Sequence, residues 1–264
     1  MKQLLLLTLL SAASCQTFAQ DTTYFNISWQ KTTADSAAYY RTKIATSPGW
    51  QVADHFINGK LQMTGAYADD SMHVSQGQFT WYEDGRIAHR CTCVQGKLEG
   101  PDTLYYPDGR KKVTGQNQAG DKQGEWLGYY PSGKLSGKAK YEKGKQISAS
   151  FYQENGSPKK NVSIFLRESE YPGGASQFLR FLNKTLRYPD SAVVYEIQGT
   201  VMTQFIVTKE GKVSDLRIIR SVNKYLDEEA LRVMRLMSDW EPAIYGGILT
   251  DTYRRQPIVF SLQN

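Results

Sequence analysis

The chain has 264 residues, which is enough for one large domain or two ordinary ones, and 40% of them are apolar. A mean hydropathy of −0.51 argues against an integral membrane protein, and an aromatic content of 12% argues against a largely disordered chain. The net charge of +6 is not gathered into one block, so it gives no indication of nucleic-acid binding. These properties are typical of a globular protein and identify no function.

Residues 1–19 have the pattern of a secretory signal peptide. Lys2 precedes an apolar run at residues 4–10, which is too short to span a bilayer, and Ala19 is a small residue suited to a cleavage site. We expect cleavage after Ala19, which would leave an exported chain without a transmembrane segment. The alternative is lipoprotein processing at Cys15, which would anchor the protein through a lipid on that sulfur.

Residues 56–160 repeat with a period close to 24. Aromatic residues lead into turn sequences that end in Gly85, Gly109, Gly133 and Gly156, and a second series of glycines lies at Gly96, Gly120 and Gly144. The dipeptides Asp-Gly, Ser-Gly and Asn-Gly predict tight hairpin turns, and hairpins placed side by side bury their aromatic rows. The sequence therefore predicts an antiparallel array of β-hairpins over residues 56–160, capped by strands from residues 20–55.

The spacing Tyr-Tyr-x-x-Gly-Lys/Arg, found at residues 105–110 and 129–134, resembles the MORN-type repeats of the YwqK-like antitoxin family. The resemblance covers about residues 56–160. It implies an array of β-hairpins that serves as an interaction surface, and it does not imply an enzyme.

After a linker at residues 161–170, the pattern of residues 171–264 changes to mixed helices and strands. The last predicted strand contains Pro257, and because proline is confined to the edges or ends of a sheet, we expect this strand to lie on the outside. The order helix–strand–strand–helix–strand predicts two helices on a three-stranded antiparallel sheet, so the whole chain is predicted to be α+β. The elements are a helix with a stripe of Phe178, Phe181, Leu182 and Leu186, strands at 200–207 and 213–219, a helix over 226–237 with Asp227 as its N-cap, and a strand near 250–261.

Spaced motifs in this last part closely resemble the TonB C-terminal domain. The resemblance covers about residues 171–264. The motifs are Tyr188-Pro189-x-x-Ala192, Ile197-Gln198-Gly199-x-Val201, Leu226-Asp227-x-Glu229-Ala230, Trp240-x-Pro242 and Pro257-Ile258-x-Phe260.

The resemblance implies binding of a protein partner by strand addition. TonB domains hold an extended peptide of outer-membrane receptors against an exposed sheet edge, where unpaired N–H and C=O groups are free to pair. Two departures from the family, a more polar last strand and the lack of a membrane helix with a Pro-rich spacer, lead us to expect that the chain does not energise transport alone. The predicted partner-binding edge consists of Thr250, Asp251, Thr252, Tyr253, Arg254, Arg255 and Gln256.

The sequence offers little chemistry for catalysis. It contains no nucleophile elbow, zinc-protease motif or phosphate loop. Cys91 and Cys93 would share one face of a strand, where they would form either a strained disulfide or two small buried thiols. We predict no catalytic site, no metal site and no cofactor, and we do not expect an enzyme.

The predicted function is therefore binding of a protein or peptide partner in the periplasm or outer membrane, as an accessory to TonB-dependent transport. The alternative is a structural protein of the cell envelope in which the hairpin repeats serve as a scaffold. Because an edge strand can also pair with a copy of itself, a homodimer through the last strand is a further expectation. Nucleic acid is not an expected partner.

Overall fold

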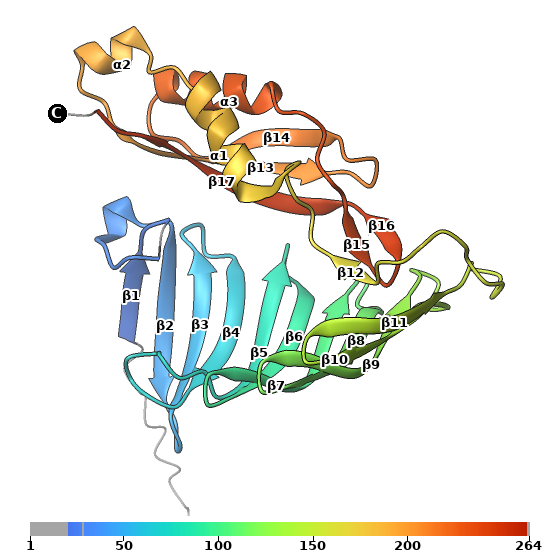
Figure 1. The fold of residues 1–264 in the computed structure, drawn as a ribbon. Helices are drawn as coiled ribbons and strands as arrows, with labels where there is room; N and C mark the ends of the chain where they lie inside the picture. Colours follow the sequence, from blue (N-terminus) through green and yellow to red (C-terminus); the bar gives the residue numbers. More distant parts are fainter. Residues whose placement is uncertain (1–20, 28, 263–264) are drawn as a thin grey trace, which may run out of the picture.

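The computed structural model describes residues 21–27 and 29–262, so the predicted signal peptide and Cys15 lie outside the described residues. The first part is an eleven-stranded sheet in which every strand pairs antiparallel with its neighbour in the sequence (Figure 1). We call residues 21–151 the hairpin array. Its elements are β1 (Asp21–Phe25), η1 (Ala34–Ser36), β2 (Tyr39–Ala45), β3 (Trp50–Phe56), β4 (Leu61–Tyr67), β5 (Gly77–Glu83), β6 (Arg86–Val94), β7 (Lys97–Tyr105), β8 (Lys111–Gln118), β9 (Asp121–Tyr129), β10 (Leu135–Glu142) and β11 (Lys145–Phe151).

The two-residue turns of the array lie mostly at the second series of glycines. Gln95-Gly96, Ala119-Gly120 and Lys143-Gly144 each join two strands directly, with positive φ at both residues, as a two-residue turn requires. The predicted tight turn at Asp84-Gly85 is confirmed. The predicted hairpin turn at Asp108-Gly109 is also present: the Gly109 N–H donates to the Tyr106 carbonyl (2.9 Å), and the Asp108 side chain accepts a hydrogen bond from the Arg110 N–H (3.0 Å).

Two tyrosines at equivalent positions connect neighbouring units of the array. The Tyr106 hydroxyl donates to the Tyr129 carbonyl (2.7 Å), and the Tyr130 hydroxyl donates to the Tyr152 carbonyl (2.9 Å). Burial raises the pKa of Tyr106 to about 12, so this hydroxyl stays a donor at neutral pH. The aromatic row therefore stabilises the array by directed hydrogen bonds as well as by packing.

The apolar face of the array is divided between two clusters. One contains Phe79, Cys91 and Cys93, and the other is centred on Trp126. Both cysteines are free and buried, which agrees with the alternative of two small thiols, and burial raises the pKa of Cys91 to about 12. Thiols in this state are poor nucleophiles because the thiolate is the reactive form.

A buried ion pair joins β2 and β3. The Arg41 guanidinium donates to both carboxylate oxygens of Asp54, from Nε at 2.6 Å and from Nη2 at 2.8 Å. Asp54 is 2% exposed, and the guanidinium lies 5.4–5.7 Å from the ring centres of Phe25, Trp29 and Tyr67. The first strands of the sheet thus contain a desolvated charge pair inside an aromatic shell.

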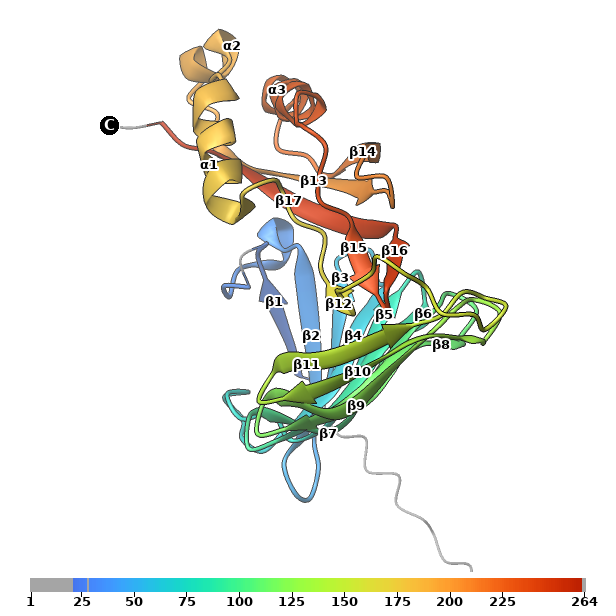
Figure 2. The ribbon, with the colours of Figure 1, turned by 45° about the vertical axis from the view of Figure 1, so that its right-hand side comes forward.

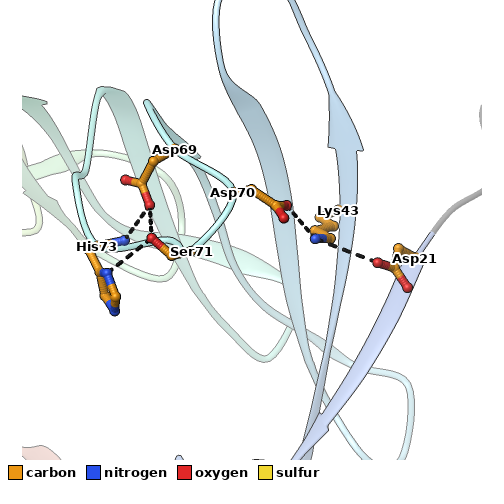
Figure 3. Close-up of polar contacts among 6 residues, drawn as sticks. All are labelled: Asp21, Lys43, Asp69, Asp70, Ser71 and His73. Carbon is orange, nitrogen blue, oxygen red and sulfur yellow. Dashed lines mark hydrogen bonds and ion pairs between the residues drawn. The ribbon is translucent and has the colours of Figure 1, made fainter.

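The loop between β4 and β5 is closed by the carboxylate of Asp69 (Figure 3). Asp69 accepts hydrogen bonds from the N–H groups of His73 (3.3 Å) and Val74 (2.8 Å) and from the hydroxyl of Ser71. The neighbouring Asp70 instead pairs with Lys43 (2.5 Å) on β2. The two carboxylates therefore close this loop and fix it to the sheet.

We expect Asp69 to titrate at about pH 2, because the hydrogen bond from Ser71, followed by that from Val74, lowers its pKa from 3.8 to about 2. A carboxylate with a lowered pKa stabilises the folded loop above pH 4, and that contribution is lost as the pH falls through 2. Carboxyl NMR of the folded protein, with the Val74 amide shift followed in parallel, measures this titration. Ser71→Ala should move the midpoint toward 3.8, and an unchanged midpoint in that variant would contradict the assignment.

The second part of the described chain packs helices on one face of a three-stranded sheet, which confirms the predicted α+β class. The sheet order is β14-β13-β17, and a second small sheet has the order β12-β15-β16. The short helix α2 and this second sheet were not predicted. The elements are β12 (Leu166–Arg167), α1 (Gly174–Thr185), α2 (Asp190–Val194), β13 (Gly199–Val207), β14 (Val213–Arg220), α3 (Lys224–Arg235), β15 (Ala243–Tyr245), β16 (Ile248–Thr250) and β17 (Thr252–Phe260).

The core of this part lies between the helices and the sheet. The predicted stripe of α1 is confirmed, because Phe178 is buried there and packs with Phe205 and Trp240. The predicted N-cap of α3 is wrong. Asn223 accepts the hydrogen bond from the Tyr225 N–H (2.9 Å), since the helix begins at residue 224, three residues before Asp227.

The turn between β15 and β16 docks onto the hairpin array. Gly246 lies so close to Gly128 of β9 that a Cβ atom built on Gly246 would be 2.6 Å from the Gly128 Cα. The Ser136 hydroxyl on β10 donates to the Gly246 carbonyl (2.9 Å). Tyr245 also joins the same buried cluster as Trp126. The two parts of the chain are thus connected by a shared core as well as by the linker.

Candidate protein-binding site

The last strand, β17, is an edge strand of its sheet. It pairs along its full length with β13, from Thr252 opposite Val207 to Phe260 opposite Gly199, and among the described residues no strand pairs with its other edge. Both views place β17 nearer to the hairpin array than β13 or β14 (Figures 1 and 2). The free edge therefore lies on the side of the sheet that faces the array.

Pro257 indicates which main-chain groups face outward from β17. Proline lacks an N–H and is tolerated where its nitrogen points away from the neighbouring strand. Main-chain groups alternate between the two edges along an antiparallel strand, so Tyr253 and Arg255 share the outward orientation of Pro257. Their N–H and C=O groups are the ones available to an added strand, and Pro257 removes a donor at one end of this segment.

The side chains of the even-numbered residues of the predicted site are engaged by the chain itself. Thr252 donates to the hydroxyl of Ser169 (2.8 Å), and Arg254 donates to the same hydroxyl (2.8 Å) and to the Ser169 carbonyl. Ser169 is fully buried. The polar character of this strand is therefore explained by an internal contact with the segment between β12 and α1.

Three other predicted residues also make contacts within the chain. Thr250 ends β16, and its hydroxyl donates to the Ile248 carbonyl (3.0 Å). Asp251 lies between β16 and β17 and accepts a hydrogen bond from the Lys209 N–H (2.7 Å). The Gln256 amide donates to the Pro257 carbonyl (3.1 Å).

The side chains of Tyr253 and Arg255 point away from the helices, toward the hairpin array. Tyr253 is 45% exposed. The Arg255 guanidinium lies 4.5 Å from the ring centre of Phe56, at the end of β3, and its Nε donates to the Gln204 side chain (3.2 Å). A second contact across the same gap joins Arg220 to the Ser36 carbonyl (2.8 Å).

Two clefts flank this edge, between the sheet and the array. One, of about 270 Å³, is lined by Phe56 and Arg255. The other, of about 700 Å³, lies between the strands β5 to β8 and residues 248–253. Tyr253 lines both clefts, so the two clefts adjoin at the edge of β17.

Three further features of the described residues concern a metal site, a polar cluster and a membrane-spanning helix. They contain no group of three or more His, Cys, Asp or Glu side chains placed to hold a metal ion. His89 binds the Asp102 carboxylate (2.7 Å), which also accepts from Asn117 (2.7 Å). Within this part of the chain no helix is both long and apolar enough to cross a membrane.

Sequence reasoning missed Ser169, Phe56 and the array residues that line the clefts. Each of these residues lies more than 80 positions along the chain from the β17 residue that it contacts or faces. No local pattern marks such contacts, because they depend on the docking of the two parts.

Comparisons with known proteins cover only the last part of the chain. No curated protein matches the sequence. A solved structure, the NMR solution structure of the TonB C-terminal domain of Helicobacter pylori, is similar at 22% identity and a TM-score of 0.28, over 35% of this chain and 88% of that one. Residues 184–262 match the family model described as Gram-negative bacterial TonB protein C-terminal.

Proposed function

We propose that this protein binds an extended peptide of a protein partner, which adds as a strand to the free edge of β17. The observation that carries the proposal is the unpaired edge of β17 at Tyr253 and Arg255, on the side of this strand away from β13. Main-chain hydrogen bonds supply affinity in this mode of binding, and alternate side chains supply specificity. The family match of residues 184–262 supports the same mode.

The setting of this binding is the cell envelope. The signal-like sequence at residues 1–19 and the TonB-type C-terminal region both fit an exported protein of the periplasm, accessory to TonB-dependent transport. The partner is then an outer-membrane or periplasmic protein that offers an extended segment. The hairpin array, with its MORN-like period, acts as the support that holds the second wall of the clefts.

The test is the variant Tyr253→Pro, which removes one outward N–H and places a ring on the free edge. The pairing with β13 should survive, because this N–H does not belong to the ladder. We expect affinity for pools of acetylated and amidated ten-residue peptides to fall by about tenfold or more, since a lost hydrogen bond and a steric block act together. Fluorescence anisotropy with the full chain measures the affinity, and amide shifts at Arg255 locate the contact.

The matched control is Tyr253→Ala, which keeps the N–H and should retain binding to within a few-fold. Equal affinities for the proline variant and the wild type would contradict strand addition at this edge. So would the absence of any peptide binding by the wild type.

The same open edge favours a second candidate, pairing with another copy of the chain. Sedimentation velocity over a range of concentrations separates the two. A dimer that Tyr253→Pro dissociates and Tyr253→Ala does not would assign the edge to self-association.

A further inference from the structure

The smaller cleft, of about 270 Å³, has apolar walls that both parts of the chain contribute. Its volume is close to the lower end of the range for small-molecule sites, roughly 300–1,000 Å³, and such sites often lie between domains. Ile57, in the turn between β3 and β4, is 51% exposed, and Ile219 on β14 is 43% exposed. A ligand that covers these side chains gains the free energy of removing apolar surface from water. The apolar lining includes Phe56, Ile57 and Leu61 from the array and Met202, Ile219 and Tyr253 from the sheet.

Three arginines of the C-terminal sheet line the same cleft. Arg217 on β14 and Arg255 on β17 lie opposite Gln204 of β13, one on each side of it. Arg220 lies opposite Met202, two positions along β13 from Gln204, and residues two apart in a strand share a face. The three guanidinium groups therefore belong to the face of the sheet that is turned toward the array.

Two of these arginines have no carboxylate to neutralise them. The Arg255 Nε donates to the neutral side chain of Gln204 (3.2 Å), and Arg220 donates to the Ser36 carbonyl (2.8 Å). Within residues 21–27 and 29–262, no ion pair joins either guanidinium to an Asp or Glu side chain. A hydrogen bond to a neutral acceptor leaves the charge in place, so both cations remain uncompensated in the cleft.

The charged side chains that line the cleft sum to a positive value. Four cations, Lys60 and the three arginines, stand against the two carboxylates of Glu83 and Asp84, which leaves +2 with Glu83 counted as fully ionised. Arg217 pairs with Asp215 (3.2 Å), which does not line the cleft, and counting this carboxylate as well leaves +1. The cleft therefore combines apolar walls with an excess of positive charge, and the ligand that fits it is an anion with an apolar body.

We propose that this cleft binds a small organic acid, whose carboxylate pairs with Arg255 and whose apolar body lies between Ile57 and Ile219. The guanidinium of Arg255 is held against the ring of Phe56 (4.5 Å), and its Nη groups donate to no described residue. They present the planar fork that suits a carboxylate, and Arg220 adds a second positive charge. The site uses side chains on the face of the sheet, whereas strand addition uses main-chain groups of the edge, so the inference does not rest on the proposed function.

The experiment uses the full chain with phenylacetate, hydrocinnamate and octanoate, each beside its neutral amide. We expect at least one acid to bind about tenfold more tightly than its amide, as for a hydrogen bond between charged groups. Isothermal titration calorimetry measures the affinities, and amide shifts at Gln204 and Ile57 locate the site. Arg255→Met should abolish the preference for the acid while the affinity for the amide stays within a few-fold. Arg255→Lys, which keeps the charge, should retain part of the preference.

The matched control is Arg180→Met, which removes an exposed arginine from α1, on the face of the sheet away from the array (Figure 1). It should leave the preference intact. Ile57→Asn should weaken the acid and its amide alike, because it removes apolar contact without changing the charge. Thermal unfolding and amide spectra should show that each variant keeps the fold.

Three results would overturn the inference. The first is that none of the three acids binds to the wild type. The second is a preference for the acid that persists in Arg255→Met. The third is competition by acetate as strong as that by hydrocinnamate, because it would show that the cleft holds an anion without using the apolar body.

Discussion

Replacing Gly246 with alanine is expected to lower the free energy of unfolding by about 2–6 kcal/mol. Two effects add. Gly246 has a φ of +62°, a backbone conformation that costs a non-glycine residue about 1–3 kcal/mol. The new methyl group would also lie 2.6 Å from the Gly128 Cα and 2.9 Å from the Ser136 Oγ, and this overpacking adds about 1–3 kcal/mol. Because both contacts belong to the hairpin array, the β15–β16 turn should be displaced from it.

The matched control is Gly109→Ala. Gly109 has a φ of +85° and no atom within 4 Å of a Cβ built on it, so only the backbone term of about 1–3 kcal/mol applies. Urea unfolding measures both variants, and small-angle scattering reports whether the two parts separate in the Gly246 variant. Equal losses of stability in the two variants would show that the close approach to Gly128 contributes nothing.

The variant Asp54→Ala, which removes the buried carboxylate, is expected to lower the free energy of unfolding by about 3–5 kcal/mol. The reason is that the Arg41 guanidinium is left without its counter-charge. The two groups share hydrogen bonds of 2.6 and 2.8 Å, and three aromatic rings surround the guanidinium. The Arg41 side chain is only 14% exposed, so water replaces the lost carboxylate only in part. Urea unfolding followed by tryptophan fluorescence measures the effect.

The double variant Arg41→Met/Asp54→Leu separates the cost of an unpaired charge from the value of the pair. An apolar pair of similar volume is expected to be neutral or stabilising, because neither group then has to be desolvated. If the double variant is as unstable as Asp54→Ala, the pair itself supplies the stability, and the explanation by an orphaned charge is wrong.

Elements that depend on local pattern were predictable from the sequence. The 24-residue spacing predicted the hairpins because a turn needs glycine at fixed positions and each strand alternates its faces. Pro257 predicted an edge strand because a central strand requires every N–H, and β17 lies at the edge. The helical stripe containing Phe178 predicted the core of the C-terminal part, because apolar residues at helical spacing lie on one face of the helix.

Features that depend on the docking of the two parts were not predictable. Gly128 and Gly246 are 118 positions apart, and neither carries a side chain whose pattern could indicate contact. The polar residues Thr252 and Arg254 suggested a wetter binding edge, but the structure pairs them with Ser169. A polar residue on a predicted strand does not reveal whether its partner is another molecule or a distant segment of the same chain.

The number of repeats in the array sets the distance between two fixed points. Gly246 docks on β9, and Arg255 reaches Phe56 at the end of β3, so the strands between them span the interval that the clefts occupy. Each 24-residue unit contributes two strands, about 10 Å at a strand spacing of about 4.8 Å. The length of the array therefore determines whether both contacts can form. A shortened array that lacked one unit could keep the contact of Gly246 with β9 or that of Arg255 with Phe56, but not both.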